Sequence, residues 1–429
     1  MSTPDRLVEL QVTGYANGGA GIARSDGRVA FVDGALPGET VIARITDDSH
    51  SAYMKAIAET ILEPSEHRRP PECFAAAAGA GCCDLSFVAP EYARELAGSA
   101  LADVLVRIGH LDLDALPAPS IEALAAESTG WRIRTRLAVG NDGRAGLRGR
   151  GSSEIITVPC AAPVSGLLRE VNALGAAPGT ELVLMADADG NRHAAELSAP
   201  HFGKGRNRKP GRDQHRRGAQ RTRSARSAPR TLRHLEGDEL VQHRVGTRTW
   251  RIPVNGFWQA HRNAPQVYTA TALRMLGAVG ITGEVHAWDL YGGAGVFTAA
   301  LLDGSADHGF TVSSIDLVDS DTDALAAAAV TLGDDAVKAH RGGVADALAS
   351  LDRPNIVISD PPRTGAGLSV VDGIVAAQPE AIVHVGCDAA SFARDVGRFA
   401  AQGYRVRAWQ GFDAFPMTHH LEAIAILTR

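Results

Sequence analysis

Cys387 is the residue of this sequence best suited to covalent chemistry. It follows the apolar stretch 381–386 and precedes a helical pattern that starts at Ala389, so we expect it between a strand and a helix. A helix N-terminus lowers the pKa of a nearby thiol and favours the nucleophilic thiolate. A lone cysteine is commonly just a small buried residue, but ligand sites in α/β proteins lie at such strand ends. We therefore predict that Cys387 is a nucleophile.

Three further segments place glycines or carboxylates at expected strand ends. The run Asp289-Leu-Tyr-Gly-Gly-Ala-Gly295 predicts a turn where a ligand can approach bare backbone. Asp319 ends the next expected strand, where this kind of fold binds a ribose diol; a helix N-cap is the alternative. Asp360 precedes Pro-Pro-Arg363, and the prolines hold its carboxylate rigidly. Amino-methyltransferases have an aromatic residue where Arg363 stands, which disfavours methylation of amino groups.

Alternating strands and helices position these residues. We expect helices at 321–332 and 389–401, and strands at 285–290, 314–319, 337–341, 355–360, 381–386, 405–412 and 423–428. Strands separated by helices indicate a doubly wound α/β sheet, which binds ligands at the carboxyl ends of its strands. No helix separates the last two strands, so we expect them to form an antiparallel hairpin at one edge.

Residues 1–63 show short strands separated by tight turns, which predicts a small β-barrel. The pattern G-x-G-I-A-R, then G-R-V-x-F-V, then A-L-P-G-E-x-V resembles the TRAM module. This module is a small OB-like barrel found on RNA-modifying enzymes. The resemblance implies that the N-terminal barrel binds RNA.

The remaining chain divides into two predicted parts. Residues 64–240 show a helical period at 92–108 and strand alternation at 131–139, which predicts a mixed α+β middle domain. Residues 241–429 form the predicted α/β domain.

Composition excludes several classes of protein. The chain has 429 residues, of which 45% are hydrophobic and 21% charged, as expected for a globular protein of two or three domains. Five cysteines are too few for a disulfide framework. There is no signal-peptide pattern at the N-terminus, and no apolar run reaches the ~20 residues that a membrane helix needs. We therefore expect a cytoplasmic protein without a membrane partner.

The net charge of −6 conceals one strongly basic segment. Residues 203–234 contain twelve Lys or Arg and a single acid, Asp213, so this segment carries +11 and the rest of the chain −17. Its Gly, Ser, Arg and Pro content cannot bury a core and predicts disorder in the free protein. Such a segment favours contact with an anionic partner such as RNA, and a merely solvated loop is the alternative.

Four motifs in order resemble the RNA 5-methyluridine methyltransferases: D-L-Y-G-G-x-G, D-P-P-R-x-G, G-C-x-x-x-x-F-A-R-D and F-P-M-T-H-H-L-E. This family uses S-adenosylmethionine (SAM) to methylate uracil in ribosomal or transfer RNA. The resemblance implies a class I SAM-dependent (Rossmann-like) methyltransferase domain, with Cys387 as the nucleophile and Glu422 as the general base. It also implies four cofactor-binding residues, namely Gln259, Tyr291, Asp319 and Asp360.

The chemistry of this family requires such residues. A thiolate that adds to C6 of uracil turns C5 into an enolate-like carbon, which can attack the methyl group of SAM. A carboxylate must then remove the C5 proton before the thiol leaves. His419 and His420 are the rival bases. The uracil must be flipped out of its stack to reach these groups.

A second group of cysteines raises the question of a metal. Cys73, Cys82 and Cys83 lie within eleven residues, and Cys160 follows a short expected strand. Many relatives of this family bind a [4Fe–4S] cluster through four such cysteines, so the resemblance implies a cluster here. Because adjacent cysteines point apart on an extended chain, Cys82 and Cys83 can share one site only across a turn. Zinc and a metal-free site are the alternatives.

The leading hypothesis is thus C5 methylation of a uridine in structured RNA by a monomer, with 23S rRNA as the first choice and tRNA as the alternative. A second hypothesis is a non-catalytic RNA-binding or ribosome-assembly factor on the same fold. The presence of both Cys387 and Glu422 speaks against that second hypothesis.

Overall fold

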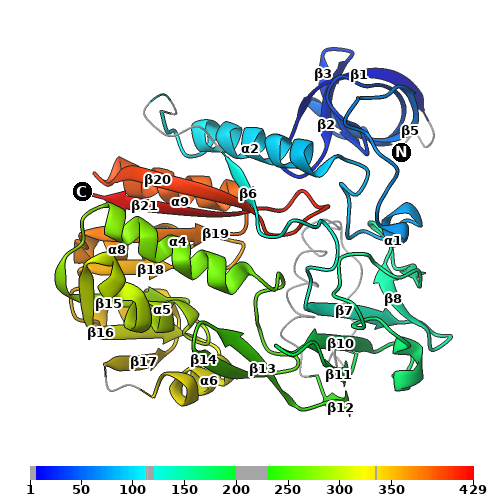
Figure 1. Ribbon diagram of the computed structural model, residues 1–429. Helices are drawn as coiled ribbons and strands as arrows, with labels where there is room; N and C mark the ends of the chain where they lie inside the picture. The colour runs from blue at the N-terminus through cyan, green and yellow to red at the C-terminus, as the bar shows by residue number, and fades with distance from the viewer. Residues whose placement is uncertain (1–5, 113, 115–119, 200–229, 334–335) are drawn as a thin grey trace, which may run out of the picture.

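The computed structural model describes all residues except 1–5, 113, 115–119, 200–229 and 334–335. Figure 1 shows a small barrel near the N-terminus, a middle sheet below it, and a larger α/β part that extends to the C-terminus. None of the described helices is both long and apolar enough to cross a membrane. Most of the basic segment 203–234, including its predicted disorder, lies outside the described residues.

The N-terminal part is a closed barrel with the strand order β1-β2-β3-β5-β4, which confirms the small barrel expected from the sequence. Its strands are β1 (Leu7–Tyr15), β2 (Gly21–Ser25), β3 (Arg28–Asp33), β4 (Thr40–Asp47) and β5 (Tyr53–Glu63). Alternate apolar residues, among them Val12, Val32 and Met54, fill its interior. The fully buried Glu39 accepts two hydrogen bonds from the guanidinium of Arg68, which ties the barrel to the chain that follows.

In the residues that the structure describes, the middle part has two helices and a six-stranded antiparallel sheet with the order β12-β11-β10-β7-β8-β9. Its elements are α1 (Phe74–Ala77), α2 (Pro90–Arg107), β7 (Arg134–Val139), β8 (Ala145–Arg148), β9 (Ile155–Ile156), η2 (Val171–Leu174), β10 (Glu181–Ala186), β11 (Arg192–Leu197) and β12 (Leu232–Glu236). The strand expected before Cys160 is therefore only two residues long. Two arginines of the basic segment, Arg230 and Arg233, pair with Glu181 and Glu196 of this sheet.

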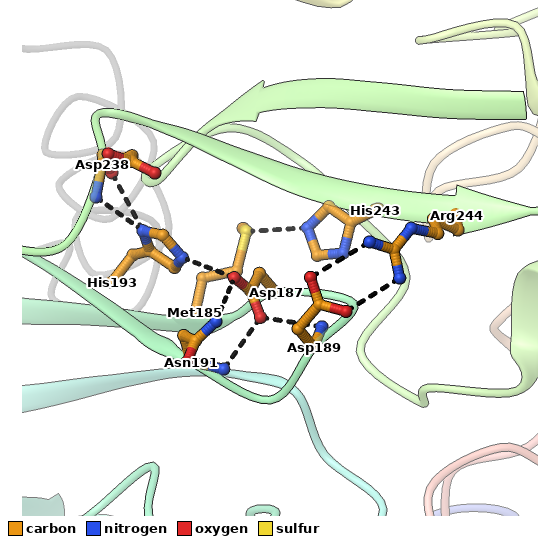
Figure 2. A network of polar contacts seen from close by, with 8 residues as sticks. All are labelled: Met185, Asp187, Asp189, Asn191, His193, Asp238, His243 and Arg244. Atoms are coloured by element: carbon orange, nitrogen blue, oxygen red, sulfur yellow. Dashed lines mark hydrogen bonds and ion pairs between the residues drawn. The ribbon is translucent and has the colours of Figure 1, made fainter.

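A hairpin of β13 (Leu240–Val245) and β14 (Arg248–Pro253) connects the middle sheet to the α/β part. Figure 2 shows the polar network that joins this hairpin to the β10–β11 turn. Asp189 forms two hydrogen bonds of 2.9 and 3.0 Å with Arg244, and Asp187 contacts His193 at 3.3 Å. His243 lies 3.2 Å from the sulfur of Met185. The hairpin is therefore fixed to the middle sheet by paired polar groups.

The C-terminal part is an eight-stranded sheet with the order β17-β16-β15-β18-β19-β21-β20-β6. Its strands are β6 (Ile121–Ala123), β15 (Gly283–Leu290), β16 (Phe310–Asp319), β17 (Val337–Arg341), β18 (Ile356–Ser359), β19 (Ala381–Gly386), β20 (Arg405–Asp413) and β21 (Glu422–Thr428). Helices cover both faces of the sheet (Figure 1): α4 (Ala264–Ala278), α5 (Val296–Gly304), α6 (Thr322–Leu332), α7 (Val344–Ala347), α8 (Leu368–Ala377) and α9 (Ala389–Ala401), with the short turns η3 (Ser305–His308) and η4 (Leu348–Ser350). All seven strands expected from the sequence are present, which confirms the doubly wound α/β class.

The expectation that the last two strands form a hairpin at one edge of this sheet is wrong in one respect. The strands β20 and β21 do form an antiparallel hairpin, but β20 is not the edge, because β6 from the middle part pairs with it in parallel. This pairing joins Ile121 to Gly411 and Ala123 to Asp413. A strand of three residues is too short to give a periodic signal in the sequence.

Candidate active site

Cys387 and Glu422 lie opposite each other at the carboxyl end of β19. Strand β19 is antiparallel to β21, which begins at Glu422, and Gly386 is paired to Ala423. Continuing this register by one residue brings Cys387 across from Glu422, and residues opposite each other in such a ladder have Cβ atoms about 5 Å apart. The structure therefore brings the predicted nucleophile and the predicted base together.

The thiol of Cys387 does not have the lowered pKa that its position suggested. Burial, followed by the charges of Glu422 and Asp360, raises its pKa to about 12, while the guanidinium of Arg363 acts in the opposite direction. The prediction of a readily formed thiolate is therefore wrong for the free protein. The favourable effect of the helix N-terminus is small and is outweighed by the loss of water and by two carboxylates.

The carboxylates of this region also hold their protons more tightly than usual. Glu422 is only 3% exposed, and burial and the charge of Asp360 raise its pKa well above the normal value. Burial and the charge of Asp289 raise the pKa of Asp360 to about 7. Burial raises the pKa of Asp289 to about 6, although the backbone and side chain of Thr298 donate hydrogen bonds to it. Raised carboxyl pKa values in one cluster are typical of acid–base sites.

The glycine turn after β15 is shaped to receive a ligand. Tyr291, Gly293 and Gly295 all have positive φ angles, of 62°, 55° and 74°. The N–H of Gly293 donates to Asp319 at 2.9 Å, and the indole of Trp250 donates to the carbonyl of Ala294 at 2.8 Å. The turn is thus held from one side by β16 and from the other by β14.

A helix N-cap was the alternative role for Asp319, but Asp319 does not cap α6. Asp321 is the N-cap of α6, and its side chain accepts from the N–H groups of Asp323 and Ala324. Asp319 instead accepts from Gly293 and from the N–H of Asp321, so it lies at the glycine turn. This position fits a carboxylate that binds a ribose diol.

Gln259 lies in the segment that leads from β14 to α4. The buried Trp258 before it stacks on His243, with ring centroids 4.5 Å apart, and packs against Trp250. These contacts link the Gln259 segment to the glycine turn through the tryptophans. Within the described residues, no hydrogen bond joins Gln259 to Tyr291, Asp319 or Asp360.

The two histidines before Glu422 have different surroundings. His419 makes a 2.5 Å hydrogen bond to Asp84, which also accepts from its backbone N–H. Burial, together with the neighbouring His419 and Arg363, lowers the pKa of His420 to about 4. The contact with Asp84 was not expected from the sequence, because the two residues are far apart in the chain. It favours a positioning role for His419.

The four clustered cysteines come together next to this loop. The sulfurs of Cys73, Cys82 and Cys83 lie 3.7, 3.7 and 3.5 Å from that of Cys160, and all four lie within 4.8 Å of one another. The chain supplies the required turn, because the N–H of Asp84 donates to the carbonyl of Cys82. The N–H of Leu85 then donates to the carbonyl of Met417, so the cysteine segment contacts the loop before Glu422 directly.

Four thiols at this spacing suit a metal. Zn–S bonds of about 2.3 Å in a tetrahedron place the sulfurs roughly 3.8 Å apart, which matches the three distances to the Cys160 sulfur. In a [4Fe–4S] cluster each thiolate binds a different iron, so the ligand sulfurs must lie farther apart. The residues therefore fit a Cys₄ metal site, and their spacing is closer to that of a single ion than to that of the cluster implied by the sequence.

The fold and the glycine turn define the class of protein: a SAM-dependent methyltransferase fold with an N-terminal barrel. The TRAM domain family matches residues 3–56. An uncharacterized RNA methyltransferase of Corynebacterium efficiens is 38% identical to this chain, in an alignment that covers 100% of the chain and 97% of that protein. The chain therefore belongs to the RNA methyltransferase family, as the sequence motifs implied.

Two further proteins are similar over nearly the whole chain. The 23S rRNA (uracil(1939)-C(5))-methyltransferase RlmD of Chromohalobacter salexigens is 29% identical, covering 98% of this chain and 89% of that enzyme. The structure of a Pyrococcus abyssi tRNA (uracil-54, C5)-methyltransferase in complex with S-adenosyl-L-homocysteine has a TM-score of 0.68 and 19% identity. The match covers 98% of this chain and 100% of that one. It shows that this chain and that enzyme have the same overall fold.

Proposed function

We propose that this protein methylates C5 of a uridine in RNA through a covalent bond between Cys387 and C6 of the base. The single observation that carries the proposal is the opposition of Cys387 and Glu422 beside Asp360. A thiol for C6 and a carboxylate for the C5 proton must both reach one pyrimidine ring. The relative that methylates uracil in 23S rRNA supports the same reaction.

The raised pKa values suggest how the site avoids premature reaction. In the free protein the Cys387 thiol keeps its proton, because burial and, to a lesser extent, the charges of Glu422 and Asp360 raise its pKa. The thiol proton leaves to the carboxylate of Asp360 as sulfur bonds to C6, and the ring electrons move toward the O4 oxygen. Glu422 stays free to take the C5 proton. The guanidinium of Arg363 lowers the pKa of both Cys387 and Glu422, so it assists ionisation where the base binds.

Glu422 then completes the reaction. A carboxylate with a raised pKa is a stronger base once ionised, and Glu422 is such a group. It takes the C5 proton, the ring electrons re-form the double bond between C5 and C6, and the sulfur of Cys387 leaves. Burial of Glu422 keeps water away from the covalent adduct.

We propose that SAM binds across the glycine turn, held by Gln259, Tyr291, Asp319 and Asp360. The positive φ angles of the turn and the carboxylate of Asp319 at its edge support this position. When bound, SAM supplies an electrophilic methyl group for C5. Asp319 would accept hydrogen bonds from the ribose hydroxyls, and Tyr291 and Gln259 would contact the rest of the molecule.

We propose ribosomal RNA as the substrate, and 23S rRNA in particular. The 23S rRNA enzyme aligns along 98% of this chain with 29% identity, whereas the tRNA enzyme supports only the fold. The test is mass spectrometry of nucleosides from a deletion strain, with the lost 5-methyluridine mapped to its position. Loss from tRNA would move the proposal to the alternative substrate, and an unchanged 5-methyluridine content would contradict it.

A further inference from the structure

Three arginines follow one face of the strand that leads away from the active site. Arg132, Arg134 and Arg136 occupy alternate positions at β7 and just before it. Alternate residues of an extended chain point to the same side and lie about 6.6 Å apart. The apolar residues between and beyond them, such as Ile133 and Leu137, are buried on the opposite face. We call these three residues the β7 arginine row.

Arg134, the middle member of the row, lacks an acidic partner among the described residues, whereas Arg132 lies within electrostatic reach of Cys82, Cys83 and Cys160. The Nε atom of Arg134 is buried there without a hydrogen bond. Burial, with added repulsion from Arg136 and Arg132, lowers the pKa of Arg134 to about 10. Arg136 lies 3.6 Å from Glu181, an acid that also pairs with Arg230. Burying a cation without a counter-ion costs stability. A bound anion would offset this cost at Arg134.

The row starts at the catalytic pocket. Arg132 is close enough to Arg363 for the two positive charges to repel each other, and the Arg363 guanidinium also acts on Cys387 and Glu422. Arg132 forms an isolated β-bridge with His261, two residues after the predicted cofactor ligand Gln259. An anion bound along β7 would therefore continue directly from the target base.

Aromatic rings accompany these cations. The guanidinium of Arg132 lies 4.5 Å from the ring centre of Trp131, and that of Arg134 lies 5.9 Å from the ring of Phe257. Phe257 is 63% exposed, although it is large and apolar. Arginines for phosphates beside an exposed aromatic ring for a base are the combination that binds single-stranded nucleic acid.

We propose that the β7 arginine row and Phe257 bind the RNA strand next to the target uridine. The guanidinium groups contact successive backbone phosphates, and a flanking base stacks on Phe257. This contact holds the strand in an unstacked form, so that the uridine can turn toward Cys387. The inference rests on the proposed function, because it assumes that RNA enters this pocket.

The test is the salt dependence of binding to polyuridylate, a single-stranded probe without base pairs. Each phosphate contact contributes about 0.7 to the slope of log K against log salt for a single strand. We expect Arg134→Gln to reduce the slope by about that amount and to weaken binding several-fold. Arg134→Lys keeps the charge and should keep the slope. Phe257→Ala should weaken binding by about fivefold or more without changing the slope.

Arg244→Gln is the matched control, since Arg244 is an exposed arginine paired with Asp189 away from the row. It removes the same charge and should leave both slope and affinity unchanged. A wild-type slope and affinity in folded Arg134→Gln would overturn the inference. So would an equal loss in Arg244→Gln, because the effect would then be one of net charge.

This test is independent of methyl transfer. If RNA methylation is absent but Arg134→Gln still lowers the slope, the proposed function fails and the RNA-binding row stands. If methylation occurs and the slope does not change, only the row is wrong.

Discussion

The active site and the network of Figure 2 differ in how completely their polar groups are paired. In the network, both oxygens of Asp187 and of Asp189 and both ring nitrogens of His193 have partners. Near the active site, within the described residues, several buried groups have no hydrogen-bond partner: the hydroxyls of Tyr268 and Ser359, one oxygen of Asp289 and both ring nitrogens of His384.

This difference separates a structural role from a functional one. Unpaired buried polar groups are rare and each costs stability, so the presence of several of them in the part of the sheet that carries Cys387 and Glu422 fits the proposed binding site. The charges of Glu422, Asp360 and Cys387 also raise the pKa of the buried Tyr268. In contrast, the paired network stabilises the junction between the middle sheet and the β13–β14 hairpin. Substitutions in the two regions should therefore affect different properties.

The largest effect should come from Cys387→Ala. We expect methylation to fall by about 10⁴-fold or more, as for other nucleophile deletions, because no bond to C6 can form. Binding of SAM, measured by calorimetry, should stay within a few-fold of wild type. Turnover of labelled SAM on RNA that lacks the modification, if retained by the variant, would refute the role of this thiol.

Glu422→Gln should separate the two halves of the reaction. The amide keeps the shape of the side chain but cannot take the C5 proton, so methyl transfer should proceed and the covalent adduct should persist. A denaturing gel should show a protein–RNA complex that carries the labelled methyl group, absent in the Cys387→Ala,Glu422→Gln double variant. Normal turnover without an adduct would instead assign the base to His419 or His420.

Cys160→Ser tests the cysteine site, since the Cys160 sulfur contacts the other three. We expect the anaerobically purified protein to contain a thiolate-bound metal and the variant to lose it. Iron with equal sulfide would support the cluster implied by the sequence, and one zinc per chain would support the observed sulfur spacing. Wild-type protein free of both metals would contradict a metal site.

Asp187→Asn should lower stability while leaving methylation unchanged. Burial alone would raise the pKa of Asp187, but hydrogen bonds from Asn191 and His193 lower it. The charged form therefore stabilises the fold above the unfolded pKa of about 3.9, and this stability is lost as the pH falls. We expect a loss of about 1–3 kcal/mol at pH 7, measured by urea unfolding. A large fall in methylation at unchanged stability would contradict the assignment.

Asp360→Asn should have an effect of the opposite sign on stability. The pKa of Asp360 in the folded protein, about 7, lies above its unfolded value. Unfolding thus releases a proton, and stability falls as the pH rises from about 4 to 7. The variant should lose this dependence and gain on the order of 4 kcal/mol at pH 8, because the two pKa values differ by about three units. SAM binding should weaken at the same time. Equal pH profiles of unfolding for variant and wild type would contradict the raised pKa.

The sequence predicted those features that depend on local pattern. Apolar strands such as β19, flanked by a helix of amphipathic period, identify the α/β sheet and the strand end that carries Cys387. The four cysteines were also grouped correctly, because their chemistry makes them conspicuous. Asp321 as the cap of α6 required the structure, since Asp319 and Asp321 are both suitable residues.

Long-range and electrostatic features could not be predicted in this way. The opposition of Cys387 and Glu422 depends on the register of β19 and β21, which no local pattern specifies. The raised pKa of Cys387 depends on burial and on the carboxylates of Glu422 and of Asp360, which follows β18. The contact of Asp84 with His419 joins segments 335 residues apart. Each of these features arises only when distant segments meet.

The short strand β6 has a consequence for how this protein folds. It pairs with β20 across a separation of 290 residues, from Ile121 to Gly411, so a segment synthesised early waits for one of the last to leave the ribosome. Without β6, the backbone groups of residues 411–413 would form an open edge able to pair with another chain. This edge lies just before the loop to Glu422. The β6 strand therefore completes the sheet of the C-terminal part, and its removal would expose an unpaired edge close to the proposed general base Glu422.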